Sequence, residues 1–510
     1  MLNGSTIAIL VAFTFYLLLM ILIGVFSMKK TRSTEDYFLG GRGLNSWVAA
    51  LSAQASDMSG WLLMGLPGSI YAAGTGKAWI AIGLFIGTVL NWLIISKRLR
   101  RYTIVANNSL TLPEFFQNRF HDKKKILLTI SSIVIVLFFL VYTASALASG
   151  GKLFNTVFGI DYHIALVIGA VVILTYTFLG GFLAVCTTDF IQGTLMLVGL
   201  MIVPIMAYAV VSGDFGGALS VSGIENSDYY MSLFYNMDGT KITLVSIISD
   251  LAWGLGYCGM PHILVRFMAI KNEKELKKSS AIAIIWVAIS LFAACAIGLI
   301  GRAYLNGSLA EGQEETVFIQ MIKTIFSGNV GYVFIGGLFL CGILAAVMST
   351  ADSQLLVCAS SVSKDIYKGI LKPDSNDKKV LRVSRITVLV VALIAFVIAW
   401  NPESSIMNFV SDAWAGLGSA FGPLVVCSLF WKRTNLPGAV AGIVTGGAFV
   451  IVWDYLPLVH GETLYTATGI YSLLLGFFIS LAAIVIVSLA TKEPSEEVQA
   501  DYDKMINYTE

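Results

Sequence analysis

Apolar residues occur in long runs along almost the whole chain, and polar residues gather mainly in the shorter stretches between these runs. A helix needs about 20 mostly apolar residues to cross the ~30 Å hydrocarbon core of a bilayer, and the runs are of this order. The pattern therefore predicts an all-α, polytopic membrane protein with about 13 transmembrane helices. We place these helices at residues 4–27, 45–67, 77–96, 126–150, 163–180, 188–211, 241–262, 280–303, 329–355, 386–400, 405–430, 436–455 and 466–490.

The overall composition agrees with a protein surrounded by lipid. Of the 510 residues, 57% are hydrophobic and only 13% are charged, whereas soluble domains carry roughly 25% charged residues. The formal net charge of +2 gives no reason to expect nucleic acid as a partner, and the sequence gives no sign of an obligate protein partner. The six cysteines lack metal-type spacing, so we expect them to be thiols at helix interfaces.

The basic residues predict how the chain is oriented. Lys29, Lys30 and Arg32 follow the first span, and further basic groups fall in alternate connections, among them 97–101 and 378–385. Because Lys and Arg are in excess in cytoplasmic loops, the pattern predicts an N-terminus outside and a C-terminus inside the cytoplasmic membrane. One missed helix would reverse every later loop, so the asymmetry also supports the number of spans.

The second predicted span contains the most informative segment of the chain, Asp57-Met58-Ser59-Gly60-Trp61, in which Asp57 and Ser59 are polar. A charge near the middle of a membrane is costly, so a carboxylate there is a candidate for a functional site. Irregular backbone at that depth occurs only where protein buries it or where it lines a cavity. We therefore expect these residues to form the unwound centre of a broken helix, which is typical of the binding site of a secondary transporter.

A second broken helix is expected at 241–262, where three glycines and Pro261 weaken an otherwise apolar span. Five spans separate the starts of the two broken helices, and this odd number favours an inverted-topology repeat. Residues 311–326 are expected to form an amphipathic helix on the membrane surface. The predicted organisation is an N-terminal flanking segment at 1–44, a transport core at 45–430 with halves at about 45–211 and 241–430, two C-terminal helices at 431–490 and a cytoplasmic tail at 491–510.

Hydroxyl groups predict where a cation binds. Ala346, Ser349, Thr350 and Ser353 share one face of the span at 329–355, because they are spaced three and four residues apart. Hydroxyl and carbonyl oxygens are the ligands of hard cations, and the carbonyl ends of half-helices coordinate such ions in transporters. These residues therefore predict a site for a hard cation such as Na⁺.

A second cation site is predicted where further carboxylates lie at a similar depth. Asp189 lies at the start of the sixth span, and Asp352 lies one turn from Ser349 and next to Ser353. Two unpaired carboxylates at this depth would be costly, and a second Na⁺ or H⁺ held by these four residues would relieve that cost. The alternative is that Asp352 caps a helix end or pairs with a cytoplasmic Lys or Arg.

Each of these features also has a purely structural explanation. Serine and threonine in membrane helices commonly bond their own backbone or join neighbouring helices. The alternative to a binding-site role is that the aromatic side chains face lipid or pack in the core, and it applies to Trp61, Tyr142 and Trp253. His262 and Arg266 are expected at a cytoplasmic helix end, where they would act as anchors. The carboxylate of the first broken helix is the hardest to explain in this way.

Several motifs of the chain resemble those of the sodium:solute symporter family. They are LSAQASDMSGWLLMGLPGSIY, AWIAIGLFIG, GGFLAVCTTDFIQG, WGLGYCGMPHILVRFMA, ILAAVMSTADSQLLV and NPESSIMNFVSDAWAGLGSAFGP, in the family's order and at its spacing from about Asp36 to the last span. The resemblance implies a LeuT-type 5+5 inverted repeat with extra flanking helices. It also implies sodium-coupled uptake of a small solute, L-proline in the branch that the motifs resemble, and no enzymatic activity.

The resemblance also implies roles for individual residues. Carbonyl groups and two hydroxyl groups would bind sodium, at Ala55, Met58, Ala346, Ser349 and Thr350. Asp57 matches the acidic residue that the family places beside this sodium site. The matching substrate pocket would be lined by Ser59, Gly60, Trp61, Tyr142, Trp253, Tyr257 and Pro261.

The chain departs from this pattern at three positions. Cys258 and Met260 stand where proline symporters tend to have Phe and Gln, and Gln54 replaces a small residue. A sodium symporter for another small amino acid or organic solute is therefore an open alternative. A membrane sensor is disfavoured because no kinase or receiver domain follows Lys492 in the sequence, and a membrane-embedded enzyme is disfavoured because the chain has no His-Glu-x-x-His motif.

Overall fold

The computed structural model describes residues 4–28, 34–177, 181–459 and 461–510. Helices are the only regular elements among these residues, and strand-like pairing there is limited to three isolated bridges. In this part of the chain ten helices are long and apolar enough to cross a membrane, and three shorter helical segments are also apolar. Each predicted span has a helical counterpart, which confirms the all-α, polytopic prediction. The basic residues Lys29, Lys30 and Arg32 lie outside the described residues.

The helices differ mainly in length and in whether they are interrupted. The main uninterrupted helices are α1 (Gly4–Met28), α5 (Ala78–Leu90), α8 (Ile126–Phe158), α9 (Tyr162–Thr177), α10 (Phe182–Val211), α15 (Glu273–Tyr304), α17 (Val330–Ser360), α18 (Asp377–Ile398), α19 (Ile406–Phe430), α20 (Leu436–Tyr455) and α22 (Ser472–Ala490). Shorter helices are α2 (Thr34–Leu39), α6 (Ser96–Val105), α7 (Leu112–Arg119), α11 (Phe215–Val221), α12 (Ser227–Tyr230), α21 (Leu464–Thr468) and α23 (Glu496–Ile506).

Polar residues determine where several helices begin and end. The Asn45 side chain accepts a hydrogen bond from Val48 N (3.0 Å), and the Asn272 side chain accepts one from Glu275 N (2.9 Å). Such caps satisfy N–H groups that have no partner in the first helical turn. Gly159 ends α8 with a φ of 65°, a conformation that glycine adopts without steric cost.

The second span is broken in the middle. Helix α3 (Ser46–Asp57) ends where Met58 leaves helical geometry with φ −81° and ψ 72°. A π-helical turn, η2 (Trp61–Gly65), and then α4 (Leu66–Ala73) complete the span. Gly60 allows the break to approach α8 closely, because a Cβ atom there would lie 2.2 Å from Ser149 Oγ. The predicted unwound centre is therefore confirmed.

The seventh span is also broken, as predicted. Helix α13 (Leu244–Leu251) continues as a 3-10 helix, η6 (Ala252–Gly259), and the chain resumes α-helical geometry in α14 (Pro261–Ala269). Between them Met260 is extended, with φ −85° and ψ 105°. The proline at the first position of α14 needs no N–H donor there, so it starts the new helix rather than disrupting it.

The predicted end of the seventh span at residue 262 was wrong, because α14 continues to Ala269. His262 and Arg266 were expected as anchors at a helix end, yet their exposed fractions are 0% and 1%. The hydropathy pattern placed the end at the first polar residues. Groups of α3, α10 and α17 compensate the Arg266 side chain, which the pattern of a single helix does not reveal. The His262 ring packs edge-on against the rings of Phe139 and Tyr142.

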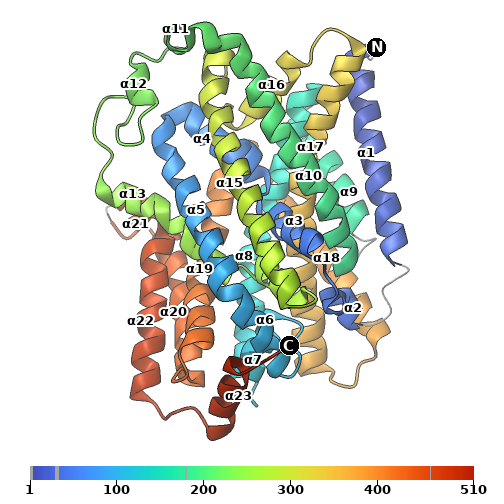
Figure 1. Cartoon of the computed structure of the whole chain (residues 1–510), viewed down its shortest axis with the longest axis vertical. Helices are drawn as coiled ribbons and strands as arrows, with labels where there is room; N and C mark the ends of the chain where they lie inside the picture. Colours follow the sequence, from blue (N-terminus) through green and yellow to red (C-terminus); the bar gives the residue numbers. More distant parts are fainter. Residues whose placement is uncertain (1–3, 29–33, 178–180, 460) are drawn as a thin grey trace.

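The two broken helices lie inside the bundle. Helix α3 packs against α10, α15 and α17, and η6 packs against α5 and α19. Figure 1 shows α1 at one edge of the molecule and the packed pair α20 and α22 at the other. The beginning of α1 and the helix α23 near the other end of the chain lie toward opposite ends of the molecule. The breaks therefore meet each other in protein rather than in lipid.

The helix predicted at 311–326 is present, but its surroundings differ from the expectation. A short 3-10 turn, η7 (Glu314–Thr316), leads into α16 (Val317–Ile325). Its apolar residues pack against α15, α17 and α4, so the amphipathic face covers protein rather than the membrane surface. The buried residues are Val317, Phe318, Ile319, Met321 and Ile322.

Candidate functional site

The break in the second span lies against the hydroxyl-bearing face of α17. Ser349 Oγ donates a hydrogen bond to the carbonyl oxygen of Ala55 at 2.8 Å and lies 3.2 Å from the carbonyl oxygen of Ala346. Thr350 Oγ1, one residue further along α17, is buried and has no hydrogen-bond partner. Met58 is fully buried and ends α3. Hydroxyl and carbonyl oxygens gathered at a helix break are chemically suited to a hard cation.

Asp57 is buried beside these groups. Its Oδ2 atom accepts a hydrogen bond from the Tyr257 hydroxyl at 2.7 Å, while Oδ1 is buried without a hydrogen-bond partner. The backbone carbonyl of Asp57 accepts from Trp61 Nε1 at 3.1 Å and from the Tyr142 hydroxyl at 3.5 Å. Groups from both broken helices and from α8 therefore converge on one residue. Ser59 joins them, because its Oγ accepts from the backbone N–H of Trp61 at 3.4 Å.

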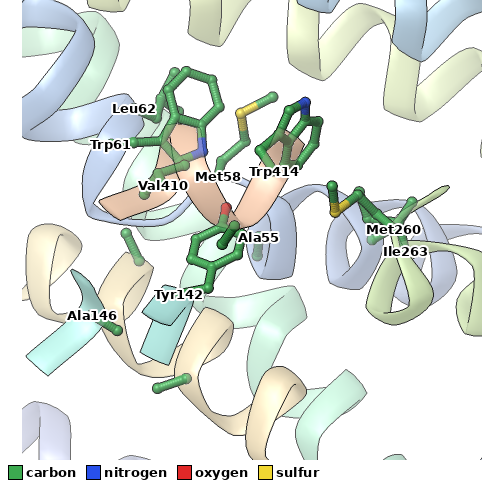
Figure 2. Close-up of a cluster of buried hydrophobic side chains, with 14 of the residues drawn as sticks. Ala55, Met58, Trp61, Leu62, Tyr142, Ala146, Met260, Ile263, Val410 and Trp414 are labelled. Carbon is green, nitrogen blue, oxygen red and sulfur yellow. The ribbon is translucent and has the colours of Figure 1, made fainter. Parts of the chain in front are cut away.

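Trp414 of α19 completes the aromatic surroundings, although it was not among the expected site residues. Its ring packs edge-on against Tyr257 with centroids 5.1 Å apart. Its Nε1 donates to the carbonyl oxygen of Trp253 at 2.8 Å. Figure 2 shows the Trp414 indole in one buried cluster with Trp61, Met58 and Tyr142. The sequence signal that could have identified Trp414 is its place in one of the motifs that carry the family resemblance.

Two of the expected pocket residues lie further from this centre. The Trp253 ring stacks on Tyr471, next to α22, with centroids 5.0 Å apart, so the ring faces the C-terminal helices. Pro261 is buried at the start of α14 and lines a cavity of about 20 Å³ together with Arg266 and Ser353. Gln54 precedes the break and is buried, with its Oε1 atom unpartnered.

The residues expected to form a second cation site have different contacts in the structure. Ser349 contacts the break in α3, as described above. Asp189 and Ser353 are linked by Arg266, whose Nη2 lies 3.2 Å from Asp189 Oδ2 and donates to Ser353 Oγ at 2.6 Å. Asp352 is fully buried next to Ser353 in the chain. Arg266 was not expected beside Asp189 and Ser353, because it is remote from both in sequence.

Comparisons with known proteins agree with this arrangement. Residues 37–446 match the sodium:solute symporter family. Among similar curated relatives are the sodium/proline symporters of Staphylococcus aureus strains JH9 and NCTC 8325. Each is 43% identical over 497 residues, which cover 96% of this chain and 94% of the relative.

Solved structures share the fold. A Na⁺-coupled sialic acid symporter in a substrate-bound outward-open state superposes with a TM-score of 0.76 at 21% identity, covering 96% of this chain and 99% of that one. A nucleobase-cation-symport-1 family transporter in a closed conformation gives a TM-score of 0.53 at 12% identity, covering 92% of this chain and 99% of that one. These likenesses confirm the predicted LeuT-type fold. The chain therefore belongs to the sodium:solute symporter family, and it is a sodium-coupled membrane transporter rather than an enzyme.

Proposed function

We propose that this transporter carries L-proline together with Na⁺ into the cell by alternating access. The observation that carries the choice of solute is the 43% identity to the Staphylococcus aureus sodium/proline symporter over 96% of the chain. The Na⁺ gradient and the membrane potential supply the work, and the electrical part is roughly 2.3 kcal/mol per charge per 100 mV. The excess of basic residues in alternate connections supports an N-terminus outside and a C-terminus inside the cell.

The sodium ion binds, in this proposal, between the break in α3 and the hydroxyl face of α17. Its ligands are the carbonyl and hydroxyl oxygens of Ala55, Met58, Ala346, Ser349 and Thr350. The Ser349 hydroxyl proton occupies the acceptor that Ala55 would offer to sodium. Binding of the ion replaces that hydrogen bond, uses the unpartnered Thr350 hydroxyl and ties the broken helix to α17.

Asp57 supports the ion by charge. The carboxylate lies two residues from Ala55 on a helix end, and its Oδ1 atom is unpartnered in the interior. A buried carboxylate is costly unless a cation compensates it. Sodium at the neighbouring oxygens would supply that compensation, so the charge favours occupancy of the site.

The solute binds, in this proposal, next to the ion and at the start of the second half-helix. The positive end of that half-helix suits the carboxylate of an amino acid. Trp61, Tyr142 and Tyr257 give an apolar wall that also suits the solute's ammonium through cation–π contact. The proposed pocket comprises Ser59, Gly60, Trp61, Tyr142, Trp253, Tyr257 and Pro261, with Trp253 acting through its contact with Trp414.

Another small amino acid or organic solute is the second candidate. Gln54, Cys258 and Met260 favour it, since they depart from the residues expected for a proline pocket. The unpartnered Oε1 atom of Gln54 is an additional acceptor near the break. A solute that carries an extra donor would therefore gain a contact that proline cannot make.

Transport by the purified protein in proteoliposomes tests this proposal. We expect an inward Na⁺ gradient to concentrate radiolabelled proline, with no uptake when K⁺ replaces Na⁺. Unlabelled proline should compete more strongly than other small amino acids, carboxylic acids or sugars. Sodium-driven uptake that proline fails to inhibit would contradict the assigned solute and favour the second candidate, while uptake unaffected by removing Na⁺ would contradict the coupling.

A further inference from the structure

A narrow cavity lies beside α17, one helical turn beyond the proposed sodium ligands. Its volume is about 20 Å³, and its lining includes Ser353, Ser361 and Thr111. Ser353 lies four residues after Ser349, and Ser361 lies eight residues further along the chain. At the rise of an α-helix this second interval corresponds to about 12 Å. The cavity therefore leads from the neighbourhood of the ion site toward the end of α17.

A larger cavity lies beyond the end of α17. The chain continues there as a π-helical segment, η8 (Ser361–Leu371), which packs against α7 and α8. The cavity has a volume of about 370 Å³, and η8, α7 and α8 contribute Asp365, Glu114 and Leu128 to its lining. Helices α7 and α23 lie toward the same end of the molecule (Figure 1), which is the cytoplasmic end in the proposed orientation. The larger cavity thus lies on the cytoplasmic side of the ion site.

One hydrogen bond joins the linings of the two cavities. Thr111, which caps α7, lines the smaller cavity and donates from Oγ1 to Asp365 Oδ1 at 2.9 Å. The exposed fractions of Thr111 and Asp365 are 5% and 2%. Asp365 Oδ2 and Ser361 Oγ, four residues earlier, are buried without a hydrogen-bond partner in the described part of the chain. Two neighbouring oxygen atoms are thus available to a ligand, and leaving them unpartnered is costly.

The charges around Asp365 indicate which kind of ligand fits. Three lysines line the larger cavity, but each ammonium group is bonded to an acceptor other than Asp365. The pairs are Lys125 with the carbonyl oxygen of Gly369, Lys364 with Glu114, and Lys368 with Asp377. The Asp365 carboxylate therefore has no ion-pair partner among the described residues. Carboxylate and hydroxyl oxygens are the ligands that hard cations prefer, and a cation would compensate the buried charge.

We infer that Asp365 and Ser361 form a transient Na⁺ site on the route by which the ion leaves toward the cytoplasm. When α7 moves away from η8, the bond from Thr111 breaks, the two cavities join, and Asp365 Oδ1 becomes a further ligand. The site then holds the ion between the buried ligands of α17 and bulk water. The inference rests on the sodium coupling and the orientation of the proposed function, but it does not depend on which solute is carried.

Sodium-driven efflux of proline from vesicles of known orientation tests the inference. A site on the exit route changes the rates at which Na⁺ passes, but it leaves the equilibrium at the buried site unchanged. Asp365→Asn keeps an acceptor for Thr111 and removes the charge. We expect the initial slope of efflux rate against cytoplasmic Na⁺ to fall at least about tenfold, the lower end of the range for charge-steered association. The Na⁺ affinity of the purified protein at equilibrium should equal that of the parent.

Three further variants separate this role from a structural one. Asp365→Glu retains the charge and should stay close to the parent. Asp377→Asn is the matched control, because it removes the exposed carboxylate that pairs with Lys368, and its slope should not change. Ser361→Ala should lower the slope in the same direction, and it decides if Asp365→Asn does not fold. An unchanged slope in Asp365→Asn, or a loss of equilibrium Na⁺ affinity by the same factor, would overturn the inference.

Chemical labelling gives a second readout that needs no solute. A Ser361→Cys thiol, labelled from the cytoplasmic side, should react faster with a cationic than with an anionic thiol reagent of similar size, after subtraction of the labelling of the six native cysteines. Adding Asp365→Asn should remove this preference. An equal or reversed preference in Ser361→Cys alone would mean that the lysines set the charge of the route, and it would overturn the inference. The expected preference without proline transport would contradict only the assigned solute.

Discussion

Among single residues, Asp57 has the most unusual surroundings. It is fully buried at the end of α3, and only one of its carboxylate oxygens has a hydrogen-bond partner, the Tyr257 hydroxyl at 2.7 Å. Its backbone carbonyl holds Trp61 and Tyr142. The side chain and the backbone of one residue therefore connect the proposed ion site to the proposed solute pocket, one by charge and the other by hydrogen bonding.

Asp57→Asn should lower the affinity for Na⁺ while it leaves the fold largely intact. Asparagine can still accept the hydrogen bond from Tyr257, but it lacks the charge that attracts the cation. We expect the Na⁺ concentration for half-maximal uptake to rise at least about tenfold, a change of about 1.4 kcal/mol. The measurement is proline uptake against Na⁺ at matched protein levels.

Asp412→Asn is the matched control for this variant. Asp412 Oδ2 also accepts from a tyrosine hydroxyl, that of Tyr455 at 2.6 Å, but it does so in an exposed setting on α19. Its sodium dependence should stay close to that of the parent protein. Equal sodium curves for Asp57→Asn and the parent would remove Asp57 from the ion site.

Trp61 and Trp253 should respond differently to truncation, because their rings face different neighbours. The Trp61 indole donates to the Asp57 carbonyl, whereas the Trp253 ring stacks on Tyr471. We expect Trp61→Ala to weaken proline affinity about tenfold, as loss of a central aromatic anchor commonly does. Trp253→Ala should lower the melting temperature with a smaller loss of affinity. Proline binding and thermal unfolding of the purified variants measure these two effects. A larger loss of proline affinity in Trp253→Ala than in Trp61→Ala would contradict the prediction.

At the scale of elements, the structure ties the segment η7–α16 to helices on both sides of the site. Lys152 of α8 donates to Glu315 Oε2 at 2.6 Å and to the carbonyl oxygen of Ser404 at 2.9 Å. Glu315 Oε1 accepts from Ser405 Oγ at 3.2 Å and from Met407 N at 3.1 Å, at the start of α19. One largely buried ion pair thus joins three segments that must separate if the site is to open on this side.

Glu315→Gln should favour opening of that side. The amide keeps an acceptor for Ser405 and Met407 but loses the charge attraction to Lys152, and couplings of 1–3 kcal/mol correspond to roughly 5- to 150-fold population shifts. Val410 of α19 is fully buried in the same cluster as Trp61 (Figure 2). We expect at least about fivefold faster modification of a Val410→Cys thiol by an impermeant reagent. Asp250→Asn, which removes the more exposed ion pair with Lys77, is the control. Equal labelling rates in the two variants would show that the Lys152–Glu315 ion pair does not hold this side closed.

At the scale of the whole molecule, the proposed site is closed from both ends. Asp57, Trp61, Tyr142 and Tyr257 have exposed fractions of 1% or less. On the C-terminal side, Arg42 donates to the carbonyl oxygens of Met268 and Ser109, and Arg100 donates to those of Ile270 and Lys271. Helix α23 packs against α6 on the same side. A solute can reach the site only if such contacts break at one end at a time, which is the requirement of alternating access.

The hydropathy pattern was sufficient for the elements. Each long apolar run became a helix, because a spanning segment must satisfy its backbone hydrogen bonds internally. The polar residues Asp57 and Ser59 marked the first break, and Pro261 marked the second, since each is unfavourable in an uninterrupted membrane helix. The hydroxyl face of α17 followed from helical spacing alone. These predictions succeeded because each depends on residues that are neighbours along one helix.

What only the tertiary structure decided were the partners between helices. Asp189 and Ser353 lie near each other in the interior, as expected. The sequence could not indicate that Arg266, which is remote from both along the chain, contacts the two of them. It also gave Trp253 and Trp414 no relative position, although one faces Tyr471 and the other Tyr257. A helical period places a residue on one face of its own helix. Whether a buried charge there is paired depends on distances of a few ångströms between helices, and packing alone sets those distances.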